Sequence, residues 1–148
     1  MSIGVAKERL CNASLEYTSI ASCTPRIVGL RKDECTRMEF FVGISVGSIA
    51  GSLDWYKRLL GREPDLLDGD HAAVWDLAEG RSLYIQHNPE HVGHVLFTMY
   101  FDDLDAVVSG IAERGIEPTR QETNAENLRM FTFEDPDGNE INFGWYAH

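Results

Sequence analysis

The chain has 148 residues and a formal net charge of −11, from 13 Lys and Arg against 24 Asp and Glu. This length fits one domain or two small repeated modules that share a core, and no stretch approaches the roughly 18 continuous apolar residues of a transmembrane helix. A surface this acidic is expected to repel nucleic-acid phosphates and to favour neutral or cationic partners.

Residues 1–37 differ from the remainder of the chain. They hold six basic and four acidic residues, a net charge of +2, which leaves seven basic and twenty acidic residues, a net charge of −13, for residues 38–148. All three cysteines (Cys11, Cys23 and Cys35) lie in this segment, with no CxxC pair, which predicts a reducing, cytoplasmic environment. Apolar residues in this segment show no sustained helical or strand periodicity, which predicts a poorly ordered extension. An arm that docks on the domain or on a partner is the alternative.

From residue 38 a regular pattern begins. Residues 39–46 are apolar, β-branched and aromatic, which predicts a strand. Ser48 suits a helix N-cap and Gly61 a C-cap. Between them, spacings of four, three and four predict one apolar helix face, formed by Ile49, Leu53, Tyr56 and Leu60. Three further strands are predicted at 62–67, 71–77 and 82–87, with turns at 68–70 and 78–80.

The same order recurs from residue 94, offset by about 54 residues. Residues 94–101 predict a strand, and Asp102 or Asp103 caps a helix that Gly115 closes. Its predicted apolar face consists of Leu104, Val107, Val108 and Ile111. Three strands follow, at 116–120, 128–134 and 140–145, with a turn at 135–139.

Each module has one helix, which covers one face of its sheet and leaves the other face in need of cover. We therefore expect an α+β domain over residues 38–148, built of modules 38–90 and 91–148. The two βαβββ modules should pair into a curved mixed sheet that forms a cup.

Three segments carry a resemblance to a known family. Ser-Val-Gly-Ser and Leu-Asp-Trp-Tyr-Lys-Arg-Leu-Leu-Gly within 45–61, Phe-Asp-Asp-Leu-Asp-Ala with Arg-Gly-Ile within 101–116, and Phe-Glu-Asp-Pro-Asp-Gly-Asn-Glu-Ile-Asn-Phe at 133–143 resemble the vicinal oxygen chelate superfamily. This superfamily includes glyoxalase I, extradiol dioxygenases, fosfomycin-modifying enzymes and bleomycin-binding proteins. The resemblance implies βαβββ modules, often a dimer, and a cup. In the enzymes, His, Glu or Gln from the first and last strands of the modules hold a divalent metal ion.

The positions that the resemblance assigns to metal ligands hold other residues here: Phe41, Tyr84, Leu96 and Asn142. Phenylalanine and leucine have no lone pair, and neutral phenol and amide groups are poor ligands, so a metal-free protein with no cofactor is expected. A shift of two residues along a strand keeps the same face. The alternative divalent-metal set reached by such shifts is Glu39, Gln86, His94 and Glu140.

A cup without metal is still a pocket for a small molecule. Strand alternation gives an apolar and aromatic lining with a few amide and hydroxyl groups, typical of such sites. The expected ligand-binding residues are Phe41, Trp75, Tyr84, Gln86, Leu96, Thr98 and Asn142. No catalytic residue is expected, because residues 38–148 contain no nucleophile elbow, phosphate loop or cysteine, and Asp135 and Asp137 read as turn residues.

The leading hypothesis is therefore a glyoxalase/bleomycin-resistance-like protein that binds a small organic molecule, favoured by charge to be cationic, in the cup. Metal-free members of the bleomycin-binding branch offer a precedent, and they imply a homodimer. One alternative is a metal-dependent lyase, isomerase or dioxygenase of the same superfamily. Another is an accessory protein whose surface, and not its cup, is used.

Overall fold

A computed structural model describes residues 39–124 and 127–147. The chain divides into two units, Met1–Met38 and Glu39–His148. The interpretations of residues 1–37 as an extension or an arm lie outside the described residues. In the described part, no helix is both long enough and apolar enough to cross a bilayer.

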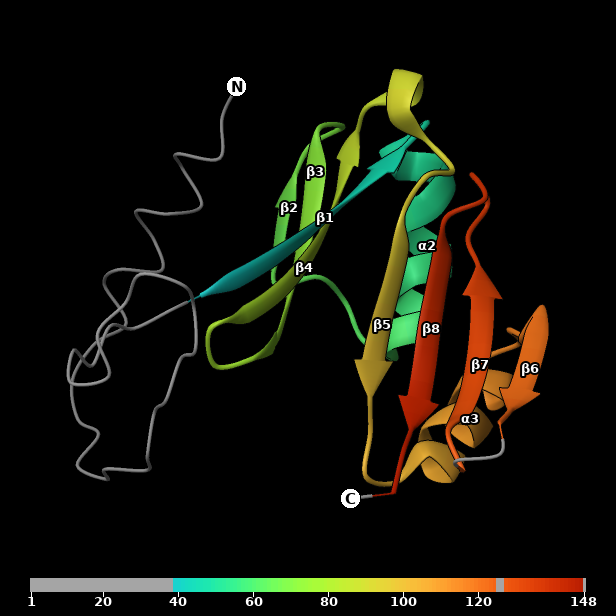
Figure 1. Ribbon diagram of the computed structural model, residues 1–148. Helices are drawn as coiled ribbons and strands as arrows, with labels where there is room; N and C mark the ends of the chain where they lie inside the picture. Colours follow the sequence, from blue (N-terminus) through green and yellow to red (C-terminus); the bar gives the residue numbers. More distant parts are fainter. Residues whose placement is uncertain (1–38, 125–126, 148) are drawn as a thin grey trace, which may run out of the picture. The chain divides into compact units, whose positions relative to one another are not determined.

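The first module forms a four-stranded mixed sheet with one α-helix (Figure 1). The strand order is β1-β4-β3-β2, with β1 parallel to β4 and the other neighbours antiparallel. A short 3-10 helix, η1 (Pro89–His91), leads into the second module. The elements of the first module are β1 (Phe40–Val46), α2 (Ile49–Leu60), β2 (Leu66–Asp68), β3 (Ala72–Ala78) and β4 (Arg81–His87).

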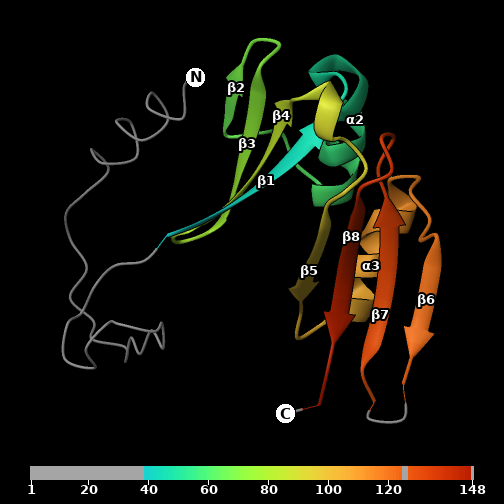
Figure 2. The same ribbon diagram turned by 45° about the horizontal axis from the view of Figure 1, so that its top comes forward.

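The second module repeats this topology, with the strand order β5-β8-β7-β6 (Figure 2). Strand β5 is parallel to β8, as β1 is to β4. The expected α+β class with two βαβββ modules is confirmed, as two four-stranded mixed sheets whose edge strands are β1 and β5 on one side. The elements are β5 (Leu96–Tyr100), α3 (Leu104–Glu113), β6 (Arg120–Thr123), β7 (Arg129–Glu134) and β8 (Glu140–Trp145).

The helix ends follow the predicted capping residues. The Ser48 side chain accepts a hydrogen bond from the Gly51 amide at the start of α2, and the Asp103 side chain accepts one from the Ala106 amide at the start of α3. Gly61 ends α2 with φ 74°, a left-handed conformation that glycine adopts without steric cost. These local signals therefore place both helices correctly.

Two predicted strands are wrong in position. Residues 62–65 of the predicted 62–67 strand form a loop held by an Arg62–Asp65 ion pair of 2.8 Å, and β2 covers only Leu66–Asp68. The predicted strand at 116–120 begins instead at Arg120, because Ile116 is buried in the core just after α3. In both places the residues that follow a helix lie in the loop that leads back to the sheet, although the sequence pattern predicts a strand for them.

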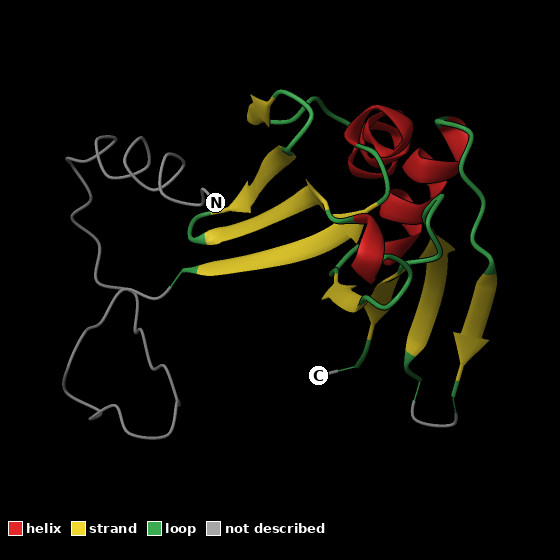
Figure 3. Cartoon of the chain, turned by 90° about the horizontal axis from the view of Figure 1, so that it is seen from above, coloured by secondary structure: helices red, strands yellow, loops and turns green. Residues whose placement is uncertain are grey.

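One continuous core lies between the sheets and the helices. Helix α2 packs on β3 and β4, α3 packs on β8, and the two helices contact each other. Figure 3 shows the helices gathered together, with the strands of the two sheets extending away from them. The largest fully buried side chains include Trp75, Tyr56, Phe133 and Phe143. Each sheet thus has a helix-covered face and a helix-free face.

The turn between β7 and β8 joins the two modules through buried polar groups. The Tyr56 hydroxyl on α2 donates to Asp135 Oδ2 at 2.7 Å, and Asn139 Nδ2 donates both to that oxygen at 2.8 Å and to the Ser45 carbonyl at 3.0 Å. Burial, with the Asp135 carboxylate next to it, raises the pKa of the Tyr56 phenol well above its ordinary value. The phenol therefore stays protonated and remains a donor.

A second carboxylate of the same turn strengthens the junction. Asp137 Oδ2 accepts from the Gly47 amide at 3.0 Å and from the Ser52 hydroxyl at 3.2 Å. Asp135 Oδ1 also closes its own turn by accepting from the Asp137 and Asn139 amides. The prediction that these aspartates fix the turn is confirmed, and they additionally connect it to α2 and to the end of β1.

Candidate ligand-binding faces

Alternation and register determine which residues share the helix-free face of the first sheet. Ile44 and Val46 are fully buried on the helix-covered side, so Phe41, Gly43 and Ser45 point to the helix-free side. Side chains of paired residues lie on the same face, which adds the β4 residues opposite them. The resulting pairs are Phe41 with Ser82, Gly43 with Tyr84, and Ser45 with Gln86.

The second sheet has the matching arrangement. Ile141 and Phe143 are buried on the helix-covered side, so the alternate residues of β8 face the other way. The pairs on this helix-free face are Leu96 with Glu140, Thr98 with Asn142, and Tyr100 with Gly144. Six of the seven expected ligand-binding residues therefore lie on helix-free faces.

Trp75 is the exception, and its expected role as a ligand-binding residue is wrong. It pairs with Leu83 on the helix-covered face and has no exposed surface. Its Nε1 donates to the Arg62 carbonyl at 3.1 Å, and its ring lies 6.1 Å from that of Tyr56. Trp75 is a core residue and does not line the cup, because the register of β3 turns it towards α2.

Three large apolar side chains, one on the first sheet and two on the second, are exposed on these faces and are available for contact with a ligand or a partner. The exposed fractions are 43% for Phe41, 66% for Leu96 and 50% for Tyr100. Two of the aromatic rings lie over glycines. A Cβ at Gly43 would collide with the Tyr84 ring, and a Cβ at Gly144 would come within 2.9 Å of the Tyr100 ring. Each sheet therefore holds a tyrosine flat against its helix-free face.

A polar row crosses the apolar lining of the second sheet. Thr98, Asn142 and Thr132 are neighbours on β5, β8 and β7. The Thr132 hydroxyl donates to Asn142 Oδ1 at 2.8 Å, and Asn142 Nδ2 donates to Thr98 Oγ1 at 3.5 Å. Asn142 is only 5% exposed and Thr132 is also buried, whereas Thr98 is half-buried. Thr132 is not among the ligand-binding residues expected from the sequence, because its place beside Asn142 depends on the pairing of β7 with β8.

The charged side chains are sorted between the two sides of the sheets. Five strand carboxylates lie on helix-free faces: Asp68, Asp76, Glu122, Glu134 and Glu140. Among the seven Lys and Arg of residues 39–148, Arg120 alone is on such a face, where it pairs with Glu122 at 3.0 Å and Glu140 at 3.4 Å. The helix-free faces are thus strongly acidic.

The donor set does not fit a divalent metal ion. At the positions that the resemblance assigns to ligands, the amide of Asn142 is engaged with two threonines and Tyr84 lies against Gly43. In residues 39–124 and 127–147, no three His, Cys, Asp or Glu side chains gather closely enough to share one ion.

The alternative metal set is spread along the strands. Gln86 pairs with Ser45, and Glu39 precedes Ser45 by six residues, a separation of roughly 20 Å along a strand. Glu140 is bonded to Arg120 on the same face. Glu39 and Gln86 therefore lie towards opposite ends of β1 and do not converge on one point.

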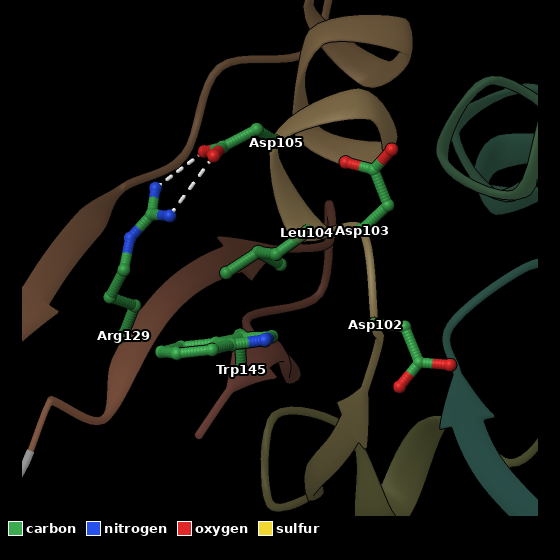
Figure 4. Close-up of a pocket in the computed structure, with 6 residues that line it drawn as sticks. All are labelled: Asp102, Asp103, Leu104, Asp105, Arg129 and Trp145. Atoms are coloured by element: carbon green, nitrogen blue, oxygen red, sulfur yellow. Dashed lines mark hydrogen bonds and ion pairs between the residues drawn. The ribbon is translucent and has the colours of Figure 1, made fainter. Parts of the chain in front are cut away.

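A surface hollow of about 270 Å³ lies elsewhere, at the start of α3. Figure 4 shows Arg129 meeting Asp105 with both terminal nitrogens, at 2.5 and 3.1 Å, with Trp145 below the pair. The Arg129 hydrogen bonds hold the pKa of Asp105 below its usual range. Arg129 and Asp105 already satisfy each other and Asp103 caps the helix, so these three charged groups of the hollow have structural partners.

Most of the chain is similar to proteins of one known family. The model of the Glyoxalase/Bleomycin resistance protein/Dioxygenase superfamily matches residues 39–143. A glyoxalase/bleomycin resistance protein from Catenulispora acidiphila DSM 44928 is 48% identical, with 75% of this chain and 100% of that chain covered and a TM-score of 0.72. No curated protein matches significantly.

Two more distant structures share the fold. A bleomycin-binding protein in complex with bleomycin is 16% identical over 75% of this chain and 100% of its own, with a TM-score of 0.62. A glyoxalase/bleomycin resistance protein/dioxygenase from Alicyclobacillus acidocaldarius is 18% identical over 74% of this chain and 92% of its own, with a TM-score of 0.61.

Proposed function

The chain belongs to the Glyoxalase/Bleomycin resistance protein/Dioxygenase superfamily, and we propose that it binds a small organic molecule against its helix-free faces without converting it. One observation carries the proposal. Phe41, Leu96 and Tyr100 expose apolar surface on these faces, beside the polar row of the second sheet. Apolar walls with a few oriented polar groups are the usual lining of a small-molecule site.

The charge distribution supports a cationic ligand. Five strand carboxylates share the helix-free faces with one guanidinium, Arg120, which is itself paired twice. Such a surface concentrates cations within about 8–10 Å at physiological salt. The ligand is thus an organic cation with substantial apolar area, and bleomycin, bound by one relative of the same fold, is among the compounds to test.

We propose further that no metal ion resides in the site and that no catalytic step occurs there. The support is chemical: the residues at the ligand positions are apolar, aromatic or amide side chains, and the alternative carboxylate Glu140 is paired with Arg120. A metal-dependent enzyme would need several charged or imidazole donors converging on one point.

The functional unit is proposed to be a homodimer. The helix-free faces expose Phe41, Leu96 and Tyr100, and the edge strands β1 and β5 border them. A second copy is the partner that would cover these surfaces and convert an open face into a cup. Light scattering coupled to size-exclusion chromatography should give twice the chain mass, and a monomer at all concentrations would contradict this part of the proposal.

Ligand binding is tested with three compounds of similar shape and different charge. Titrations followed by amide NMR shifts should rank phenyltrimethylammonium above its neutral isostere tert-butylbenzene, and both above benzenesulfonate. The cation's advantage should shrink in 1 M salt, because screening weakens its attraction to the carboxylates. Shifted amides should map to β1, β5 and β8.

Two results would contradict the proposal. Binding of none of the three compounds, nor of bleomycin, would remove the small-molecule role and leave the accessory role. A stoichiometric transition metal in protein purified without chelator, lost in Glu140→Ala, would favour the metal-dependent enzyme. Asp70→Ala, in the exposed turn between β2 and β3, serves as the matched control.

A further inference from the structure

The polar row of Thr132, Asn142 and Thr98 has a fixed hydrogen-bond direction. Asn142 Oδ1 only accepts, so the Thr132 hydroxyl must donate to it across 2.8 Å. Asn142 Nδ2 only donates, so Thr98 Oγ1 is the acceptor at 3.5 Å. The row therefore runs from Thr132 through Asn142 to Thr98.

This direction leaves a proton at one end of the row. Thr98 accepts from Asn142 and keeps its own hydroxyl hydrogen, for which residues 39–124 and 127–147 provide no acceptor. Successive hydrogen bonds polarise one another, so the terminal hydroxyl becomes a better donor. Thr98 is also the half-buried member of the row and lies on the edge strand β5.

The surroundings of Thr98 select the kind of acceptor. Leu96 and Tyr100, two residues to either side on the same face, are 66% and 50% exposed. Glu140, which pairs with Leu96, brings a carboxylate to the same face and disfavours an anionic oxygen. A neutral oxygen attached to an apolar group fits both conditions.

We infer that Thr98 determines specificity by donating a hydrogen bond to a neutral acceptor oxygen of the ligand, such as a ketone or amide carbonyl. This inference rests on the proposed function, and it narrows the ligand class to a molecule that carries a carbonyl-type oxygen besides its apolar area. Asn142 is a positioning residue, because it acts by orienting the Thr98 hydroxyl.

The test uses acetophenone and α-methylstyrene, which have the same shape but differ in a C=O against a C=CH₂ group. Dissociation constants come from amide NMR titrations of the wild type, Thr98→Val and Thr98→Ser. Thr98→Val should weaken acetophenone binding about two- to tenfold, the loss of one hydrogen bond, and leave α-methylstyrene within about twofold. Thr98→Ser, which keeps the hydroxyl, should retain the acetophenone affinity.

Thr123→Val, at an exposed position on the other side of β6, is the matched control and should change neither constant. Equal effects of Thr98→Val on both compounds, or no effect on either, would overturn the inference while the small-molecule role stands. If the wild type binds phenyltrimethylammonium but neither of these two compounds, the inference is overturned while the proposed function stands. If it binds none of the compounds in either panel, the proposed function is overturned as well. Asn142→Leu, which removes the orienting amide, should reproduce the acetophenone loss seen in Thr98→Val.

Discussion

The helix-covered and helix-free faces of the sheets both carry large apolar side chains, but the two faces differ in how deeply these side chains are buried. On the helix-covered side, Trp75 and Phe133 are fully buried, whereas on the helix-free side Leu96 and Phe41 remain exposed. Within the strands, all five carboxylates lie on the helix-free faces, whereas Arg120 is the one arginine of three that lies there.

This difference separates the residues that maintain the fold from those available for binding. The helix-covered face contains the packing and the inter-module hydrogen bonds, so substitutions there should cost stability without a specific effect on ligands. The exposed side chains of the helix-free face contribute little to the packing of a single chain, so substitutions of these side chains should change binding and leave stability almost intact. The predictions that follow probe this separation.

Asp135→Ala should have the largest effect. It leaves the Tyr56 hydroxyl and two turn amides without their acceptor in a buried site, and it removes one of the two acceptors of Asn139 Nδ2. The expected loss is about 3–5 kcal/mol in the free energy of unfolding, measured by urea denaturation. Asp70→Ala should stay within about 0.5 kcal/mol, and equal losses for the two variants would contradict a special role for the turn.

Trp75→Phe should come next. The smaller ring leaves a cavity and gives up the hydrogen bond to the Arg62 carbonyl, which together cost about 2 kcal/mol. The affinity for phenyltrimethylammonium should not change, since Trp75 has no exposed surface. If the variant loses affinity for phenyltrimethylammonium at an unchanged free energy of unfolding, Trp75 contacts the ligand and is not only a core residue.

Tyr56 makes stability depend on pH in the alkaline range. Its folded pKa is raised, so above pH of about 10 the unfolded chain releases this proton while the folded chain keeps it. Stability from this group is complete below pH 10 and falls by about 1.4 kcal/mol per pH unit above it. Tyr56→Phe should show a flatter decline between pH 10 and 11 in denaturant titrations, and an identical slope would contradict the burial argument.

Leu96→Ser should have the smallest effect on the fold. The side chain is exposed, so the free energy of unfolding of the isolated chain should change by less than about 0.5 kcal/mol. The affinity for tert-butylbenzene should nevertheless fall severalfold, and the dimer should dissociate more readily. A large loss in the free energy of unfolding with unchanged binding would show that Leu96 maintains the fold and does not contact the ligand.

Much of the fold could be predicted from the sequence because its signals are local. The Ser48 and Asp103 caps, the apolar faces of α2 and α3 and the repeated order of elements need no knowledge of distant contacts. The face shared by Phe41, Gly43 and Ser45 also follows from alternation within a single strand.

The candidate site was less predictable because it depends on the register between strands. A one-residue difference in register moves a side chain to the opposite face of the sheet. The register between β3 and β4 therefore decides that Tyr84 lies on the helix-free face while Trp75 is buried on the other. The same limit applies to Thr132, whose place beside Asn142 comes from the pairing of β7 with β8. The contact of Tyr56 with Asp135, 79 residues apart, left no sequence signal beyond the turn itself.

The turn at residues 135–139 also sets an order of events during synthesis. Ser45, Gly47 and Tyr56 leave the ribosome long before their partners, which follow 94, 90 and 79 residues later. The first module therefore emerges before the native partners of these groups exist, and water solvates them until the β7–β8 turn docks. We expect the first module to reach its native state only at that point. Ribosome-stalled chains ending before residue 135 should accordingly remain sensitive to protease in the first module, and this interval is when a chaperone would bind.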